Sequence, residues 1–159
     1  MTKVEQVYTT YIRTTPQKLW DALTSAEFSE QYWGGRHISD WKKGSKWKLI
    51  RKGADTPNMV GSVLESNPPN KLVVSWAKPD DKSPEASHSR VTYLIEPVAD
   101  SDMVRLDVIH GNLEAGSDMH TGINNGWPRV LSSLKSFLET GKALDIWVMK
   151  GSCDEPKVA

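Results

Sequence analysis

Residues 123–141 read INNGWPRVLSSLKSFLETG, and their apolar side chains recur at the spacing of one helix face. The apolar positions are Ile123, Trp127, Val130, Leu131, Leu134, Phe137 and Leu138. Such a stripe predicts a long amphipathic helix that Gly141 ends. Because Pro128 has no backbone N–H to donate, we expect a kink or a fresh helix start near residues 126–127. A helix this long and one-sided must bury its stripe against another element.

The segment before this helix is rich in strand patterns separated by turn residues. Strands are expected at about residues 38–41, 46–51, 59–65, 72–76, 90–96 and 104–110. In the last of these, Leu106, Val108 and His110 share one face while Arg105 and Asp107 share the other. This alternation predicts an antiparallel sheet with one buried face, on which the helix packs.

A further strand and two short helices precede this sheet in sequence. Residues 7–13 are rich in β-branched and aromatic side chains and predict the strand. Thr15 followed by Pro16 indicates a helix start, and Ser25 indicates a second one. Gly34 and Gly35 end the second helix. The fold class is therefore α+β, with a curved antiparallel sheet of about seven strands wrapped on a long C-terminal helix.

Composition excludes several classes of protein. The 159 residues carry 20 Lys and Arg against 20 Asp and Glu, so no overall charge favours nucleic acid. No apolar run is long enough to span a membrane, and the single cysteine, Cys153, excludes a disulfide framework. The four histidines lack metal-ligand spacing, so we expect no metal or cofactor. We expect a cytoplasmic protein with one domain over residues 1–142 and a partly apolar tail over residues 143–159.

A single helix cannot fill the concave side of such a sheet, so we expect a cavity between them. Seven tryptophans against two phenylalanines make indoles the main large rings available to line it. Trp33, Trp41 and Trp127 are placed near its rim by their positions beside a loop and a proline. The alternative is that these three rings only seal the core. The candidate ligand-binding residues are Trp33, Trp41, Trp76, Arg90, Tyr93, Val108, His110 and Trp127.

His110 is the leading candidate for chemistry, because the alternation of its strand places an imidazole on the buried face. Glu65 has the parity of Gly61 and Val63 and could face the same cavity, where it could pair with His110 or Arg90. The alternatives are a histidine that is hydrogen-bonded to a neighbouring loop, and a solvated Glu65 at a strand end.

Several segments in the expected order resemble a known superfamily. They are Tyr11 to Leu23, Gln31 to Trp33, Ser39 to Ser45, Gly61 to Glu65 with Pro68 and Pro69, Leu72 to Trp76, and Gly126 to Gly141. Over about residues 4–142 the chain resembles the START-like helix-grip (SRPBCC) superfamily, and within it the branch named after the activator of heat-shock-protein-90 ATPase homologue. The superfamily includes carriers of hydrophobic ligands, cyclases and aromatases, hormone receptors and co-chaperones.

Three functions are therefore open from the sequence. The first is binding of a small hydrophobic or aromatic molecule, as a carrier, sensor or stress-related protein. The second is an enzyme of the cyclase or aromatase type that uses His110, and the third is a co-chaperone-like activator of the heat-shock-protein-90 ATPase. Because few polar residues face the expected cavity, the sequence favours binding over catalysis.

The tail contains a second apolar run, from Leu144 to Met149. Exposed apolar residues in such a run would favour association, so we expect the run to pack back on the domain. A homodimer contact is the alternative, and the chain is expected to be a monomer or a homodimer.

Overall fold

The computed structural model describes residues 2–147, and its element order is the one the sequence predicts. The elements are β1 (Lys3–Arg13), α1 (Pro16–Thr24), α2 (Ala26–Trp33), β2 (Gly35–Ile38), β3 (Lys46–Arg51), β4 (Met59–Asn67), β5 (Lys71–Trp76), the short helix η1 (Glu85–Ser87), β6 (Ser89–Pro97), β7 (Met103–Glu114) and α3 (Asp118–Thr140).

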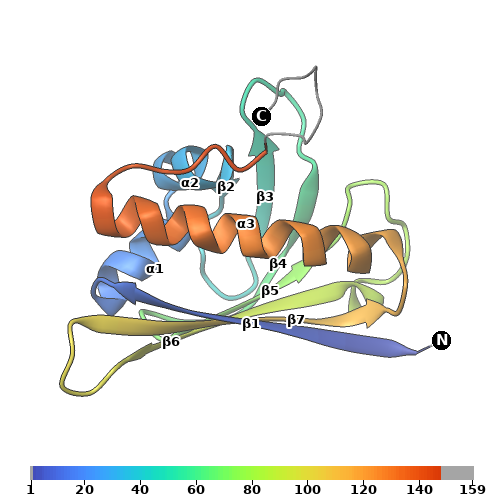
Figure 1. The fold of residues 1–159 in the computed structure, drawn as a ribbon. Coiled ribbons are helices and arrows are strands. Elements are labelled where there is room, and N and C mark those ends of the chain that lie inside the picture. The colour runs from blue at the N-terminus through green and yellow to red at the C-terminus, as the bar shows by residue number, and fades with distance from the viewer. Residues whose placement is uncertain (1, 148–159) are drawn as a thin grey trace.

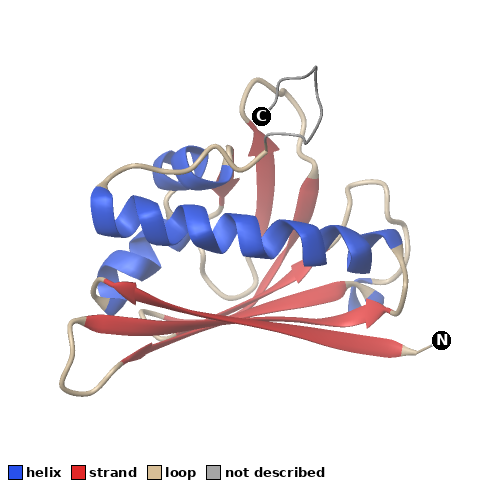
Figure 2. Ribbon diagram, in the orientation of Figure 1, coloured by secondary structure: helices blue, strands red, loops and turns tan. Residues whose placement is uncertain are grey.

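The seven strands form one antiparallel sheet in the order β1-β7-β6-β5-β4-β3-β2. The sheet curls, and α3 runs across its inner side (Figure 1). Figure 2 shows α1 and α2 beside the C-terminal end of α3, where Phe28 of α2 packs against Phe137 with 5.7 Å between ring centroids. This is the α+β helix-grip fold.

The core lies between α3 and the inner face of the sheet. Leu106, Val108 and His110 of β7 have no exposed surface, as their alternation predicts. Leu134 of α3 is 1% exposed and belongs to the same apolar cluster. The stripe on α3 and the buried face of the sheet therefore cover each other.

The first strand lies at an edge of the sheet, where backbone groups can be left without strand partners. Two side chains of α3 bind such groups. Lys135 Nζ donates to the Tyr11 carbonyl at 2.7 Å, and a Glu139 carboxylate oxygen accepts from the Arg13 N–H at 2.8 Å. Lys135 and Glu139 also pair with each other at 2.8 Å. The helix thereby holds the end of β1 against it.

The strand expected at residues 38–41 is misplaced, because β2 instead covers Gly35–Ile38. Gly34 ends α2 in the left-handed conformation, with φ of 86°, and Gly35 pairs at once with Arg51 of β3. The turn that ends the helix therefore also starts the strand.

A fresh helix start near residues 126–127 is also wrong, because α3 begins at Asp118 and continues through Pro128. Ser117 precedes the helix, and its hydroxyl accepts a hydrogen bond from the His120 N–H. This cap, and not the proline, sets the start of the helix.

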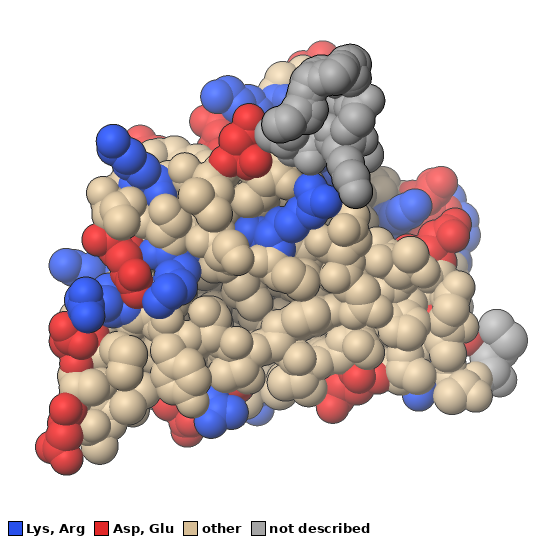
Figure 3. Space-filling view, viewed as in Figure 1, with Lys and Arg blue, Asp and Glu red and all other residues tan. Residues whose placement is uncertain are grey.

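Among the described residues, no helix is long and apolar enough to cross a membrane. On the face shown in Figure 3, acidic and basic side chains are scattered and neither sign dominates. This agrees with the formal net charge of zero.

We predict that Gly61→Ala strongly destabilises the fold. A Cβ at Gly61 would lie 1.9 Å from the Ser75 carbonyl oxygen and 2.5 Å from Trp47 Nε1, which are themselves hydrogen-bonded at 2.8 Å. We expect a loss of about 3 kcal/mol in the free energy of unfolding, measured by urea denaturation. Gly122→Ala is the matched control, because a Cβ there meets no atom within 4 Å, and it should gain about 1 kcal/mol. Equal free energies of unfolding for the two variants would show that a Cβ at position 61 does not clash with Ser75 and Trp47.

Candidate functional site

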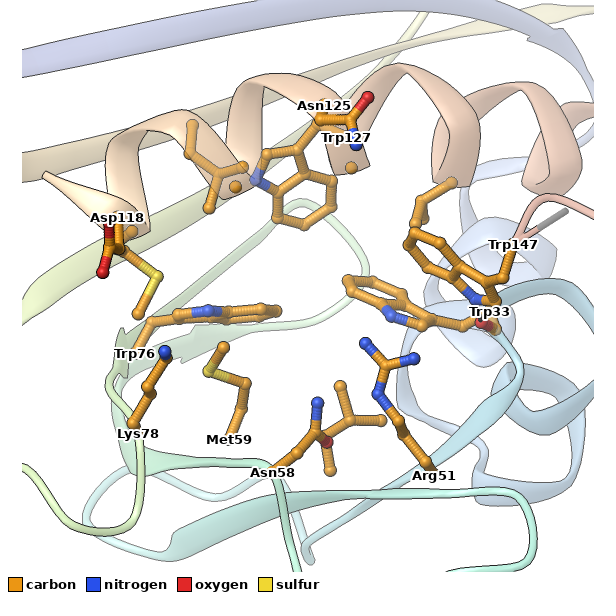
Figure 4. A pocket seen from close by; sticks show the side chains of 16 residues that line it. Trp33, Arg51, Asn58, Met59, Trp76, Lys78, Asp118, Asn125, Trp127 and Trp147 are labelled. Atoms are coloured by element: carbon orange, nitrogen blue, oxygen red, sulfur yellow. Dashed lines mark hydrogen bonds between the residues drawn. The ribbon is translucent and has the colours of Figure 1, made fainter. Parts of the chain in front are cut away.

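A pocket of about 250 Å³ lies between the N-terminal half of α3 and the ends of β3, β4 and β5 (Figure 4). Trp127, Met119 and Gly122 line it from α3, while Trp76 and Met59 line it from the sheet. The pocket thus lies in the cavity position that the sequence predicts.

Three indoles from separate elements meet at this pocket. Trp33 ends α2, Trp76 ends β5, and Trp127 lies on α3. Ring centroids are 5.3 Å apart for Trp33 and Trp127, 5.7 Å for Trp76 and Trp127, and 5.8 Å for Trp33 and Trp76. The three rings are at most 9% exposed, so they form the floor of the pocket.

A chain of hydrogen bonds fixes Trp127 from behind. Its indole N–H donates to His110 Nδ1 at 3.0 Å, and His110 Nε2 lies 2.9 Å from Ser89 Oγ. Since an indole nitrogen only donates, Nδ1 must be the acceptor, and the proton of a neutral ring is on Nε2. Ser89 Oγ in turn donates to the Trp76 carbonyl at 2.6 Å. We call this chain the Trp127–His110 relay.

Burial keeps the two inner histidines neutral. It lowers the pKa of His110 from its ordinary value of 6.5 to about 3, and the pKa of His37 in the same way. His37 packs on Trp33 with 4.3 Å between ring centroids. The floor of the pocket therefore carries no charge near neutral pH.

The chain after α3 returns to the domain and closes one side of the pocket. Ser133 on α3 exchanges hydrogen bonds with Leu144, donating at 3.3 Å and accepting at 3.0 Å. Trp147 Nε1 donates to the Trp33 carbonyl at 2.5 Å. Ala143, Ile146 and Trp147 thus pack on the domain, whereas the Leu144 side chain is 47% exposed. Val148 and Met149 of the apolar run lie outside the described residues.

Charged side chains are confined to the rim. Figure 4 shows Arg51 and Lys78 reaching from the sheet side toward the indoles, with Asp118 on the α3 side. The Arg51 guanidinium lies 5.4 Å from the centre of the Trp147 ring. When the Asn58 amide is oriented so that both of its ends are satisfied, its oxygen accepts from Arg51 Nε at 3.1 Å. The arrangement can hold a flat apolar group on the floor and a polar group at the rim.

The structure brings together most of the predicted ligand-binding residues. Trp33, Trp76 and Trp127 line the pocket. Tyr93 and His110 lie behind the floor, where Tyr93 meets Trp127 edge-on at 6.0 Å. These two, with the fully buried Val108, support the lining rings and do not line the pocket themselves.

Three predicted residues lie elsewhere. Glu65 pairs with Lys71 at 3.3 Å with half its side chain exposed, because a register shift between Val63 and Glu65 reverses the face of β4. Arg90 is exposed on the face opposite Val91. Trp41 stacks on Trp47 at 6.5 Å under the 39–45 loop, away from the pocket. Glu65 therefore cannot pair with His110.

Arg51, Lys78 and Trp147 line the pocket, although the sequence analysis did not select them. The alternation of buried and exposed residues along the strands could have identified the two cations, Arg51 and Lys78. Arg51 continues the parity of Trp47 and Leu49, and Lys78 continues that of Val74 and Trp76. An ionisable residue that ends an inward-facing series is thus a rim candidate. For Trp147 the only signal is the apolar run after Gly141.

A second hollow of about 680 Å³ is lined by side chains of β3 and of the 78–88 loop. There the carboxylate of Glu85 accepts hydrogen bonds from Ser62 at 2.7 Å and Ser75 at 3.1 Å. These bonds fasten the loop to the sheet, so we assign Glu85 a structural role. Within residues 2–147, no three His, Cys, Asp or Glu side chains are grouped as metal ligands.

Comparison with known proteins agrees with this fold. Residues 13–139 match the sequence model of the family described as activator of Hsp90 ATPase homolog 1-like protein. The match covers most of the chain, so the protein belongs to this family. No curated protein matches the sequence.

Several solved structures share the fold at low sequence identity. The solution structure of the Aha1 dimer from Colwellia psychrerythraea has a TM-score of 0.73 and 23% identity, over 88% of this chain and 99% of that one. An HSP90 activator from Plasmodium falciparum has a TM-score of 0.69 and 23% identity, over 84% and 95%. CalU16 from Micromonospora echinospora has a TM-score of 0.67 and 19% identity, over 89% and 77%.

The Trp127–His110 relay predicts an acid-sensitive stability. The unfolded histidine takes up a proton below its ordinary pKa of 6.5, while the folded one stays neutral to about pH 3, so stability falls as pH falls between these values. Each such histidine contributes a slope of about 1.4 kcal/mol per pH unit. His110→Gln, whose amide can also accept and donate, should therefore show a shallower slope from pH 6 to 4.5 in urea denaturation.

His88→Gln is the matched control, because the His88 ring is only half-buried and its Nε2 lies 3.0 Å from the Ser83 carbonyl oxygen instead of a relay side chain. It should keep the slope of the unmodified protein. Identical pH slopes for His110→Gln and the unmodified protein would show that His110 is not held neutral by the fold.

Proposed function

We propose that the protein binds a small, flat aromatic or apolar molecule in the pocket between α3 and β3–β5, as a carrier or sensor. The observation that carries the proposal is the floor of three mutually contacting indoles under a space of about 250 Å³. Ligand sites in proteins are typically apolar clefts of about 300–1,000 Å³ with a few polar groups. A volume of about 250 Å³, just below this range, suits a ligand of one or two rings.

The apolar contacts set the strength of such binding. Burying about 150 Å² of ring surface contributes about 4 kcal/mol at 25 cal/mol per Å². That free energy corresponds to a Kd of about 1 mM, before the costs of association. A neutral ring should thus bind weakly, and a tighter ligand needs polar contacts at the rim.

The hydrogen bonds of His110 argue against an enzyme of the cyclase or aromatase type that uses this residue. Both ring nitrogens are engaged within the relay, at 3.0 Å and 2.9 Å. A general base needs a nitrogen within reach of the reacting proton. We therefore assign His110 the role of positioning Trp127 under the ligand.

A pocket-filling substitution tests the proposal. An added Cβ at Gly122 meets no atom within 4 Å, so Gly122→Leu has room to occupy the space above the floor. Indole at ten times its Kd should raise the Tm of the unmodified protein by about 3 °C, and Gly122→Leu should abolish this shift.

Gly122→Ala is the control, because it improves the helix in the same way but is too small to fill the pocket. It should keep the response to indole. An equal Tm shift in the leucine variant would place the ligand elsewhere, and no shift in any variant would reject the binding function.

A second candidate is stimulation of a heat-shock-protein-90 ATPase. Family membership and the fold shared with the Plasmodium falciparum HSP90 activator support it. We expect an equimolar amount of the protein to raise the rate of ATP hydrolysis by purified Hsp90. The destabilised Gly61→Ala variant serves as the negative control. An unchanged rate with the folded protein would exclude this role for the Hsp90 tested.

A further inference from the structure

The rim of the pocket carries more positive than negative charge. Arg51 and Lys78 face Asp118 across the opening, so the three side chains sum to one positive charge. Within residues 2–147, neither cation forms an ion pair with a carboxylate. Cations of this kind beside an apolar floor are available for an anionic group on a ligand.

Two contacts fix the position of the Arg51 guanidinium beside the pocket. The guanidinium lies 5.4 Å from the centre of the Trp147 ring, and the Asn58 amide, oriented to satisfy both of its ends, accepts the Arg51 Nε–H at 3.1 Å. Figure 4 shows the guanidinium directed from the sheet toward Trp33. The remaining N–H groups of a fixed guanidinium form a fork that matches a carboxylate better than a lysine does.

The indole floor would by itself also suit a cation, since the faces of aromatic rings attract positive charge. The charges at the rim favour an anionic ligand over a cationic one. A cationic ligand on the floor would approach both Arg51 and Lys78, and Asp118 is the one acidic residue among the described lining residues that would offset them. An anionic group on the ligand is attracted by both cations. It also supplies the polar contact at the rim that a neutral ring lacks.

We propose that the pocket selects planar aromatic acids, with the ring on the floor formed by Trp33, Trp76 and Trp127 and the carboxylate against the Arg51 guanidinium. Lys78 adds to the attraction from the same side of the pocket. This inference rests on the proposed binding function and narrows it to one class of ligand.

Three ligands with the same ring and different charges separate the possibilities. We would titrate the full chain by calorimetry with indole-3-acetate, indole-3-acetamide and tryptamine, which are anionic, neutral and cationic. A charged contact at a partly exposed rim should make the acetate bind about tenfold more tightly than the amide. Tryptamine should bind most weakly.

Two variants and a control show which positive charges determine the affinity for the acetate. Arg51→Gln should weaken indole-3-acetate about tenfold, and Lys78→Gln about threefold, while both leave the neutral amide unchanged. Lys48→Gln removes the same charge from strand β3 at an exposed position that does not line this pocket, and should change neither. The Arg51 guanidinium also contacts the Trp147 ring, so Arg51→Gln could move that ring. Lys78→Gln tests the role of positive charge without removing this contact.

The outcomes distinguish this inference from the proposed function. If the amide or tryptamine binds as tightly as the acetate, or if the two variants weaken all three ligands equally, the selection for acids is wrong while the pocket remains a binding site. If none of the three ligands binds the unmodified protein, the proposed binding function fails as well.

Discussion

The indole N–H of Trp127 is buried under α3, and the position of the helix depends on where that N–H finds its acceptor. A buried donor without a partner costs about 1–3 kcal/mol. His110 accepts at 3.0 Å, and Ser89 continues the chain to the Trp76 carbonyl. These residues lie on β7, β6 and β5, so one chain of hydrogen bonds ties the helix to three neighbouring strands. The same bonds hold the Trp127 indole and the backbone of Trp76.

The relay also determines the electrostatics of the pocket. Because burial lowers the pKa of both His110 and His37, the two imidazoles stay neutral near neutral pH. No histidine charge therefore lies beneath the floor near neutral pH. The charges beside the pocket are therefore those of its rim, where Arg51, Lys78 and Asp118 lie.

Hydrophobic periodicity predicted most of the helices and strands of the fold. The stripe on residues 123–138 and the alternation over residues 104–110 predicted the helix and the strand that pack together. The caps Thr15 and Ser25 predicted the starts of α1 and α2, and both accept the expected backbone hydrogen bonds. Each of these signals lies in residues that are close in sequence, so it could be recognised without knowing the tertiary contacts.

The candidate site was only partly predictable, because it depends on register and on contacts distant in sequence. Alternation correctly placed His110 and Trp76 inside, but the register shift in β4 turned Glu65 outward, and no residue type in that strand signals the shift. Trp147 reaches Trp33 across more than a hundred residues of sequence. Such a contact follows from the path of the chain after α3, which no periodicity encodes.

A flat ligand that rests on Trp127, held by His110, and on the neighbouring indoles must change the environment of their N–H groups, which a nuclear magnetic resonance titration detects. Each of the seven tryptophans gives one such signal in a proton–nitrogen correlation spectrum. On titration with indole-3-acetate, we predict shifts for Trp33, Trp76, Trp127 and Trp147, and unchanged signals for Trp20 and Trp41, which do not line the pocket. Shifts confined to Trp20 and Trp41, or no shifts at any concentration, would contradict the account.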